Sequence, residues 1–411
     1  MMVAASLIEL TKNPINISIF ERNNELGKKV VISGGGRCNV TTGILDIPTV
    51  LTKYPRGQNF LKPAIFNFPP IEVQQWFTNH GVPLKTESDL RVFPQSDDGH
   101  DIVKVFNKLF KQNNISVNLN TTVQEVKRLN DKFIINTFCK ANNTKTQLEF
   151  DYLIITTGGQ AYRHTGSHGD GYNFAEALGH TVTSLAPSLN AFKAEHVSNW
   201  DLAGLSFQDI DLTLNSQSKK FKFRGDFVFT HQGLSGPAIF ALAAQAAYEP
   251  LSQETPASLS LDLTPDLNQE ELRTLLVSRL KNSDKLTKNL LFKIVPQKIA
   301  NLICQLLKIE NLPGDKIVEK QLNQLVDKIK HFQLTVLGRA AGEEFVTAGG
   351  VPTKEVSAKT MESRKCPNLY FAGEILDVDG LTGGFNLQAS WATGRLAAES
   401  IIAKNRQSTI S

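Results

Sequence analysis

The sequence predicts an α/β protein in which a discontinuous α/β domain holds an inserted β-rich domain, which itself carries a helical insert. Three observations support this order. Strand-like segments lie far apart in the sequence: residues 15–20 alternate apolar and polar side chains, residues 151–156 form a near-continuous apolar run, and residues 369–371 form one more short strand. Short alternating runs of β type follow from about residue 187. Leucines at helical spacing then mark residues 265–330.

The first part of the chain alternates helices and strands. We expect helices at residues 3–11, 71–79 and 100–110, and strands at residues 15–20, 116–119, 121–126, 133–137 and 151–156. Asn13-Pro14 is expected to end the first helix, because proline lacks the N–H that a continuing helix needs. This order favours a parallel sheet whose ligand loops lie at the carboxyl ends of its strands.

The residue pattern changes in the middle of the chain, and this change predicts the domain boundaries. Short β-like runs are expected at residues 210–214, 221–223, 227–230, 258–263, 332–337 and 344–347, and a closing helix at residues 388–403. The expected boundaries are 1–186 with 348–411 for the discontinuous domain, 187–264 with 331–347 for the β-rich domain, and 265–330 for the helical insert.

Composition limits the class of protein. The chain has 411 residues, of which 41% are hydrophobic and 20% charged, as in a globular protein with a large core. The best candidate for a membrane span, residues 238–248, is too short and contains Gln245. Four widely spaced cysteines predict neither a disulfide framework nor a zinc site. Since there is no basic leader, we expect a cytoplasmic protein with no metal and no membrane partner.

Charge is spread unevenly along the chain. The net charge is +4, but residues 273–330 hold twelve Lys and Arg residues against five Asp and Glu residues. Such a local excess is typical either of a nucleic-acid-facing surface or of a solvated helical face. Both interpretations stay open for this region.

A glycine-rich segment near the C-terminus has the features of a cofactor loop. The predicted strand at residues 369–371 runs into Gly373 and Glu374, and Gly383-Gly384-Phe385-Asn386 precedes the last predicted helix. Glycines let backbone N–H groups approach a ligand closely, and a helix N-terminus carries partial positive charge. This end suits the anion that develops on a reduced flavin ring, and Glu374 can accept hydrogen bonds from ribityl hydroxyls.

A second glycine-rich segment, residues 33–39, predicts the other half of that site. Its three consecutive glycines can present successive amides to a ligand, and Arg37 can neutralise anionic charge. The segment follows the strand-terminal acid Glu21 by about a dozen residues, and such an acid in a βαβ unit commonly binds adenosine ribose hydroxyls. The two segments together predict a site for flavin adenine dinucleotide (FAD).

Cys38 and His231 are the candidate catalytic residues. No second cysteine lies near Cys38, so dithiol exchange is not predicted; its thiol can donate a proton beside the flavin or serve packing alone. His231 lies in a polar loop rich in glycine and serine, which suits acid–base chemistry as well as a structural role. His164 and His168 are weaker candidates, and Asp170 is expected to cap the helix that follows it.

Five motifs, in this order, resemble a known family. They are ISGGGRCNVT, TTGG with TGSHGDGY, FTHQGLSGPAI, VTAGGVPTKEV, and LYFAGEILDVDG with TGG and NLQ. They resemble the bacterial BaiN/RdsA (YhiN-like) family of FAD-dependent oxidoreductases, over about residues 3–398. The resemblance implies a glutathione-reductase-like (Rossmann-type) FAD domain with an inserted β-barrel-like domain that carries a helical insert.

The same resemblance implies which residues contact FAD. Carried over by position, they are Glu21, Lys29, Ser33, Gly34, Gly35, Gly36, Arg37, Cys38, Asn39, Val123, Gly158, Gly373, Glu374, Gly383, Gly384, Asn386 and Leu387. NAD(P)H is expected as a transient hydride donor, because the sequence holds no separate glycine-rich unit for a nicotinamide domain.

The sequence departs from the family pattern at its start. The family's first strand and its G-x-G-x-x-G turn would precede Met1, so both are expected to be missing from the sequence as given. Because that turn supplies amides to the pyrophosphate and that strand is central to the sheet, this sequence is expected to bind FAD poorly. Thr42 in place of asparagine and Leu381 in place of proline are smaller departures.

The expected activity is passage of hydride from NAD(P)H through FAD to an unsaturated substrate. The family points to two substrate classes: a uridine of 23S ribosomal RNA, which becomes dihydrouridine, and a steroid-like small molecule. The basic residues 273–330 favour RNA, because RNA phosphates are attracted to a basic surface. The rival interpretation is a non-catalytic relic that binds RNA or another partner without flavin.

Overall fold

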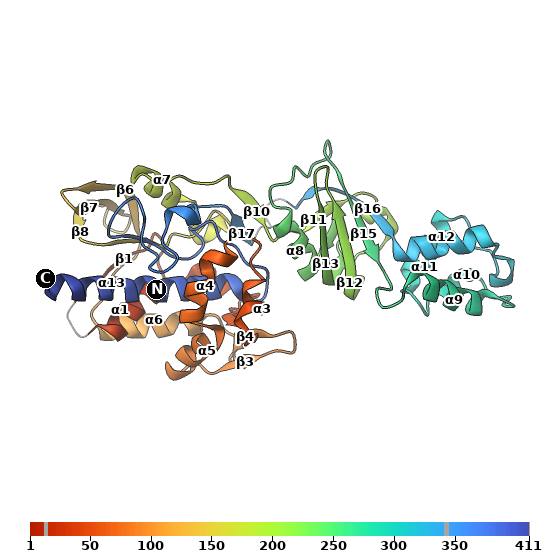
Figure 1. The fold of residues 1–411 in the computed structure, drawn as a ribbon, viewed down its shortest axis with the longest axis horizontal. Coiled ribbons are helices and arrows are strands. Elements are labelled where there is room, and N and C mark those ends of the chain that lie inside the picture. Colours follow the sequence, from red (N-terminus) through yellow and green to blue (C-terminus); the bar gives the residue numbers. More distant parts are fainter. Residues whose placement is uncertain (12–14, 341–344, 411) are drawn as a thin grey trace. The chain divides into compact units, whose positions relative to one another are not determined.

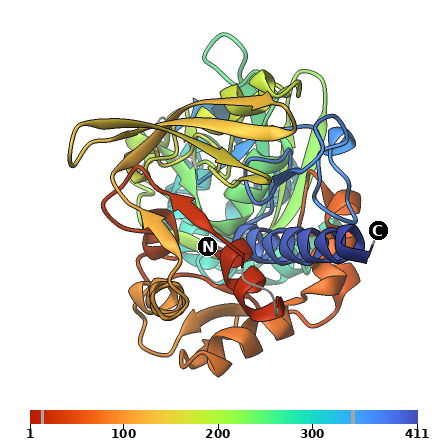
Figure 2. The same ribbon diagram turned by 90° about the vertical axis from the view of Figure 1, so that its left-hand side faces the viewer.

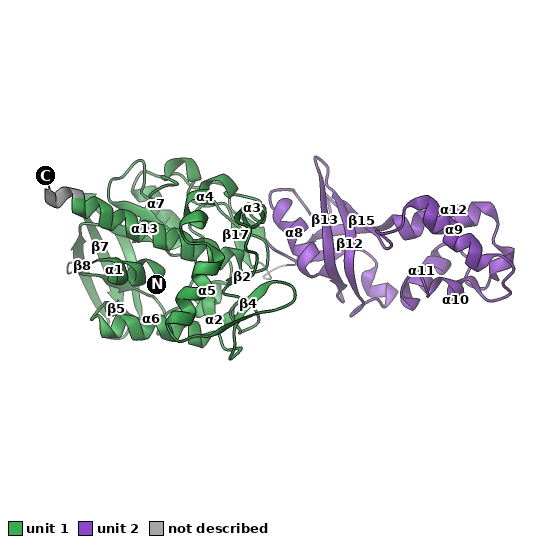
Figure 3. Ribbon diagram, turned by 60° about the horizontal axis from the view of Figure 1, so that its bottom comes forward, with its two compact units in different colours: residues 1–188, 345–411 green, residues 189–344 purple. Residues whose placement is uncertain are grey.

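The chain folds into two compact units. The computed structural model describes residues 1–11, 15–340 and 345–410. One unit comprises Met1–Ser188 and Phe345–Ser411, and the other comprises Leu189–Glu344 (Figure 3). The predicted helix end at Asn13-Pro14 and the first residue of the predicted strand at 344–347 lie outside the described residues.

Two parallel strand pairs in the first unit bring distant segments together. Strand β1 (Ser18–Phe20) pairs with β5 (Ser116–Asn118), and β9 (Leu153–Ile155) pairs with β18 (Leu369–Phe371). The β9–β18 pair confirms that a strand from each half of the chain enters one sheet. Since the two strands are parallel, the loops that follow them start from the same edge.

The first unit also contains two small antiparallel sheets of three strands each. One is the meander of β6 (Thr121–Leu129), β7 (Lys132–Cys139) and β8 (Thr144–Phe150). The other has the order β2 (Thr41–Thr42), β4 (Arg91–Pro94), β3 (Leu84–Thr86). A further pair, β10 (Ala186–Ser188) with β17 (Val346–Ala348), lies where the chain leaves this unit and returns to it.

Helices from both ends of the chain pack together in the first unit. They are α1 (Met2–Leu10), α2 (Lys28–Ile32), α3 (Ile47–Leu51), α4 (Gln58–Asn67), α5 (Pro70–Asn79), α6 (His100–Gln112), α7 (Asp170–Ala177) and α13 (Phe385–Ile410). Helix α13 runs beside α1 (Figures 1 and 2). A Cβ at Gly394 of α13 would lie only 3.3 Å from the Met2 Cβ, and Arg395 pairs with Glu9 at 2.9 Å. Glycine therefore permits the close approach of these two helices.

A buried polar cluster fastens the segment before β18 to the end of α7. Both nitrogens of the His180 ring are hydrogen-bonded. Nδ1 lies 3.0 Å from Glu355 Oε2, and Nε2 lies 2.7 Å from Ser363 Oγ. Glu355 also receives hydrogen bonds from Thr181 and Lys365, which hold its pKa at about 2 although burial alone would raise it. Burial lowers the pKa of His180, so the ring is held neutral.

The second unit is built on a closed barrel. Its strand order is β11 (Phe192–Ala194), β14 (Gly233–Ser235), β13 (Lys220–Phe229), β12 (Ser206–Asn215), β15 (Ala257–Asp262), β16 (Phe332–Arg339). Alternate residues of β12, such as Leu212 and Leu214, point into the core, which is the pattern that predicted these strands. The apolar helix α8 (Pro237–Gln245) packs on β13.

Four helices form the predicted helical insert between β15 and β16. They are α9 (Gln269–Leu280), α10 (Thr287–Leu291), α11 (Gln297–Leu306) and α12 (Glu319–Lys330) (Figure 1). Asn268 and Glu271 form a capping box at the start of α9. Leu272, Leu276 and Leu280 are buried along one face of α9, as their spacing predicted. None of the helices in the described part of the chain is long and apolar enough to span a membrane.

Candidate cofactor site

The two glycine-rich segments meet in the first unit. Lys29 of α2 donates to the Glu374 carboxylate at 2.6 Å. With its amide oriented to satisfy both neighbours, Asn39 accepts a hydrogen bond from the Gly384 N–H at 3.0 Å and donates to the Thr41 carbonyl at 3.0 Å. Predicted residues from the two ends of the chain therefore contact each other directly.

The first turns of α13 hold this junction in place. Gln388 accepts a hydrogen bond from Thr41 Oγ1 at 2.5 Å, and Trp391 donates from its indole to the Val40 carbonyl at 2.9 Å. Both bonds are buried, so they are shielded from competition with water. A Cβ at Gly384 would lie 2.3 Å from the Thr41 carbonyl oxygen, so this position requires glycine.

The glycine loop after α2 is open toward solvent. Gly34, Gly35 and Gly36 all have positive φ, a conformation that favours glycine. A side chain at Gly35 or Gly36 would meet nothing within 4 Å. The backbone there is thus exposed, and its role as a cofactor loop stays a prediction.

Glu374 is the polar centre of the C-terminal half-site. One carboxylate oxygen accepts from the Thr347 N–H at 2.9 Å, and the other accepts from Lys29. Its side chain is 14% exposed, which leaves it a small opening. A small pocket beside it combines predicted residues with apolar ones that the sequence did not single out: Leu61, Gly373, Glu374, Leu376, Val378, Asn386, Ala389 and Thr393.

Asn386 has a role that its motif did not reveal. Its side-chain amide accepts from the Gly380 N–H at 2.8 Å and donates to the Gly380 carbonyl at 2.8 Å. These two bonds close the loop that precedes α13. In this arrangement the Asn386 side chain shapes the loop, while the following residue, Leu387, is half-buried in the first turn of the helix.

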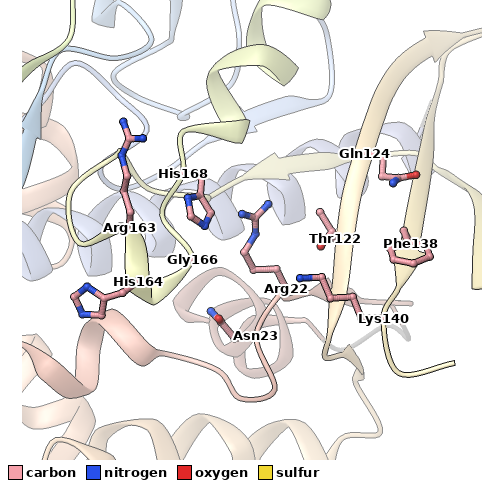
Figure 4. Close-up of a pocket in the computed structure, with 10 residues that line it drawn as sticks. All are labelled: Arg22, Asn23, Thr122, Gln124, Phe138, Lys140, Arg163, His164, Gly166 and His168. Atoms are coloured by element: carbon pink, nitrogen blue, oxygen red, sulfur yellow. The ribbon is translucent and has the colours of Figure 1, made fainter. Parts of the chain in front are cut away.

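Glu21 directly precedes Arg22 and Asn23, which line a pocket of about 500 Å³. Its Oε1 accepts from both the backbone and the side-chain N–H of Asn23, at 2.9 and 2.8 Å. The pocket is lined by Arg22, Asn23, Thr122, Gln124, Phe138, Lys140, Arg163, His164, Gly166 and His168 (Figure 4). These lining residues include five basic or imidazole side chains and no carboxylate. The weaker candidates His164 and His168 are thus pocket residues on the loop before α7.

Two predicted contacts, Val123 and Gly158, border the same region. Val123 lies in β6 between the pocket residues Thr122 and Gln124, where the register with β7 shifts. Gly158 has a φ of +74° in the loop after β9. The prediction that Asp170 caps the next helix was wrong: Asp170 is the first residue of α7, and its carboxylate pairs with Arg22.

Arg37 is already engaged within the protein. Its guanidinium lies 2.6 Å from Glu87 and 3.4 Å from Asp97, and it stacks 3.8 Å above the Phe93 ring. An anionic ligand would compete with these two carboxylates. Sequence reasoning missed them because they lie far along the chain from Arg37.

The two candidate catalytic residues lie in different units and different environments. Cys38 is fully buried, and burial raises the pKa of its thiol to about 12, against a smaller opposing effect of the hydrogen bond with Ser33. The thiol is therefore protonated near neutral pH. His231 is exposed in the loop between β13 and β14 of the second unit.

Comparison with known proteins decides the family. The model of the HI0933-like protein Rossmann domain matches residues 1–400. The chain belongs to the HI0933-like Rossmann family. This membership confirms the predicted family resemblance and, with the parallel pairs and the barrel, the predicted Rossmann-type FAD domain with an inserted barrel.

Three relatives of this chain are named as enzymes of ribosomal RNA or bile acids. The chain is 29% identical to the ribosomal RNA dihydrouridine synthase of Haemophilus influenzae, covering 97% of this chain and 94% of the relative. It is 27% identical to the 3-dehydro-bile acid delta(4,6)-reductase of Clostridium scindens, covering 96% and 95% of the two chains. The ribosomal RNA dihydrouridine synthase of Escherichia coli is 26% identical and covers 94% of this chain and 92% of its own length. These relatives place the chain among oxidoreductases.

Solved structures agree with this fold. The 3-ketosteroid delta1-dehydrogenase of Sterolibacterium denitrificans has a TM-score of 0.50 at 12% identity, and the match covers 98% of this chain and 97% of that one. The quinol fumarate reductase of Escherichia coli also has a TM-score of 0.50, at 14% identity, with 100% and 69% covered. At this identity the likeness concerns the fold alone.

Proposed function

We propose that this protein is an FAD-dependent reductase that saturates a carbon–carbon double bond of its substrate with NAD(P)H as donor. The observation that carries this proposal is the junction of the two glycine-rich segments through Lys29 with Glu374 and Asn39 with Gly384. When bound, FAD supplies a group that accepts and donates hydride. The open glycine loop leaves backbone N–H groups free to meet such a ligand.

The residues at the site would each hold a different part of FAD. Glu374 can accept hydrogen bonds from ribityl hydroxyls, with Lys29 balancing its charge. The start of α13 offers backbone N–H groups and partial positive charge to the ring. Glu21, with the adjoining pocket of about 500 Å³, would take the adenosine end, where Arg22 can cover the base.

A uridine of 23S ribosomal RNA is the substrate that we favour. Two relatives are named ribosomal RNA dihydrouridine synthases, and the basic residues 273–330 lie in a surface-exposed helical insert. Reduction of a uridine adds hydride to one carbon of its double bond and a proton to the next, so a proton donor is required. Our candidates for that donor are His231, which is exposed, and Cys38, whose buried thiol would have to become accessible to the substrate first. A cytoplasmic location would give access to ribosomal RNA.

A steroid-like small molecule is the second candidate substrate. The observation that favours it is the bile-acid reductase of Clostridium scindens, which is 27% identical over nearly the whole chain. The two candidates differ in size and charge. A small, rigid ring system with a single carboxylate would make little use of the basic insert, whereas RNA carries one phosphate per nucleotide.

An absorbance titration tests the proposed cofactor. Purified protein mixed with FAD should retain the yellow flavin spectrum after gel filtration, and NADPH or NADH should bleach it without oxygen. Protein that stays colourless after incubation with FAD would refute the proposal and support the non-catalytic alternative. Mass spectrometry of ribosomal RNA from a deletion strain then separates the substrates, because an unchanged dihydrouridine content would remove the RNA candidate.

A further inference from the structure

Positive charge in the helical insert is concentrated around α10. From residue 279 to residue 298 the chain holds six Lys and Arg residues and a single acidic residue, Asp284. Lys281, Lys285 and Lys293 are exposed, and Lys288 is half-buried. This segment therefore carries most of the excess charge that the sequence placed in the insert.

The lysines around α10 lack the acidic partners that four other basic residues of the insert have. Arg273 pairs with Glu319, and Lys298 lies 3.1 Å from Asp201. Lys316 and Lys330 likewise pair with Asp315 and Asp262. Within the described ranges, Lys281, Lys285, Lys288 and Lys293 have no ion pair within 4 Å, so their charge is available to a ligand.

An exposed aromatic ring lies among these lysines. Phe292 directly follows α10 and is 49% exposed. Lys293 is its neighbour in sequence, and Lys288 lies four residues before it, on the same face of the helical turn. Its neighbour Leu291 is buried, so the turn is anchored in the core while Phe292 faces solvent.

The backbone around this surface is fixed by the rest of the insert. The Gly314 N–H donates to the Lys285 carbonyl at 3.0 Å, and the Asp315 N–H donates to the Ser283 carbonyl at 2.9 Å. Thr287, which starts α10, is buried and bonds the Leu312 carbonyl through its N–H at 2.9 Å. The side chains thus extend from an ordered frame, which lowers the entropy cost of binding.

We propose that Phe292 with Lys285, Lys288 and Lys293 is the docking surface for a single-stranded segment of the RNA substrate. Single-stranded RNA is bound where an aromatic ring stacks on a base and ammonium groups meet the flanking phosphates. This surface supplies both groups. The inference rests on the proposed function for its choice of RNA, and it adds the site at which the RNA is held.

Fluorescence anisotropy with a labelled single-stranded uridine-rich RNA tests the surface on the full chain. Lys285→Ala/Lys288→Ala/Lys293→Ala should weaken binding and lower the magnitude of the slope of log affinity against log salt by about 2, since each phosphate contact in a single strand contributes about 0.7. Phe292→Ala should weaken binding about 5- to 100-fold with an unchanged salt slope, and Phe292→Trp should restore it.

A matched control removes the same charge elsewhere in the unit. Lys219, Lys220 and Lys222 are exposed on the hairpin of β12 and β13. Their triple alanine variant should bind RNA within about twofold of wild type. Each of three outcomes would overturn the docking surface. They are equal losses of RNA affinity in the two triple variants, wild-type affinity in the Phe292→Ala variant, and no RNA binding by the wild-type protein.

The outcomes also separate this inference from the proposed function. Uridine reduction is measured on the same samples, by mass spectrometry of the RNA. Protein that binds RNA through this surface but leaves uridine intact would refute the reaction and keep the surface. Protein that reduces uridine, but whose α10 variants bind as wild type, would refute the surface and keep the reaction.

Discussion

The Lys29 ammonium lies 2.6 Å from the Glu374 carboxylate and so joins α2 to a loop 345 residues further along the chain. Glu374 is largely buried, and its other carboxylate oxygen accepts a hydrogen bond from the Thr347 N–H. A buried carboxylate without its cation is costly, because burial penalises the charged form. This one pair therefore couples the stability of the first unit to the shape of its cofactor site.

Lys29→Ala should weaken both properties. We expect the free energy of unfolding to fall by about 1–3 kcal/mol and the dissociation constant for FAD to rise about tenfold. Denaturant unfolding and quenching of flavin fluorescence measure the two effects. Lys28→Ala is the control, because Lys28 makes only a long contact of 3.9 Å with the exposed Glu25. Similar effects of the two variants would contradict the role of Lys29.

Gly384→Ala should destabilise the junction of the two half-sites more than backbone strain alone explains. A Cβ there would meet the Thr41 carbonyl oxygen at 2.3 Å, at a φ of +87°. Gly179→Ala is the matched control, since Gly179 has a φ of +89° but open space where the Cβ would lie. We expect a loss of about 1 kcal/mol at Gly179 and at least about 3 kcal/mol at Gly384, measured by denaturant unfolding.

The Arg56 and Asp379 pair should behave as a buried ion pair. Asp379 is fully buried and receives hydrogen bonds from Arg56, at 2.5 Å from its Nε, and from Ser188 at 2.7 Å. Burial raises the pKa of Asp379 despite these partners. Arg56→Leu should cost about 3–5 kcal/mol, and adding Asp379→Asn should recover part of it. A double-mutant cycle with additive losses would exclude the coupling.

Acid should weaken the first unit through the cluster of His180 and Glu355. The folded-state pKa of Glu355 is lowered to about 2, so its contribution is present above its ordinary pKa of about 4.5 and is lost as pH falls toward 2. His180 also has a lowered pKa, so its contribution is lost as pH falls below its ordinary value of about 6.5. Both effects have the same sign. Glu355→Gln should flatten the loss of unfolding free energy between pH 4.5 and 2, which urea titrations at each pH would measure.

Thiol labelling should distinguish the cysteines. Cys139 is partly exposed, and hydrogen bonds lower the pKa of its thiol, first among them one from the Ala141 backbone. Buried Cys38, with a pKa of about 12, should react with iodoacetamide only when the protein unfolds. Peptide mass spectrometry after brief labelling should therefore find Cys139 modified and Cys38 unmodified. Rapid labelling of native Cys38 would show that its thiol is accessible to a substrate.

The sequence predicts those elements of this fold whose apolar residues form a short bounded run or a regular helical spacing. The β9–β18 pair follows from two short apolar runs in the sequence, and the α9 face follows from leucine spacing. Strand β8 was missed because its exposed residues show no apolar alternation, and α8 was missed because it is apolar on all sides. Pattern reasoning detects a difference between two faces, and these elements have none.

At the candidate site, the sequence predicts residue types better than partners. Lys29, Glu374 and the glycines were singled out, and the structure brings them together. The bonds of Asn386 with Gly380 and of Arg37 with Glu87 were not foreseen. A sequence motif shows which side chains are present. Only the folded structure shows which of them already form a hydrogen bond or an ion pair within the protein.

The strand pair β10–β17 has a consequence for how this protein can change. Ser188 and Val346 are direct partners in that pair, so the chain leaves the first unit and re-enters it at adjacent positions. A short turn could bridge them as in an ordinary hairpin. The barrel and its helices can therefore be replaced by another domain, in evolution or by protein engineering, without breaking the strand pairs of the first unit.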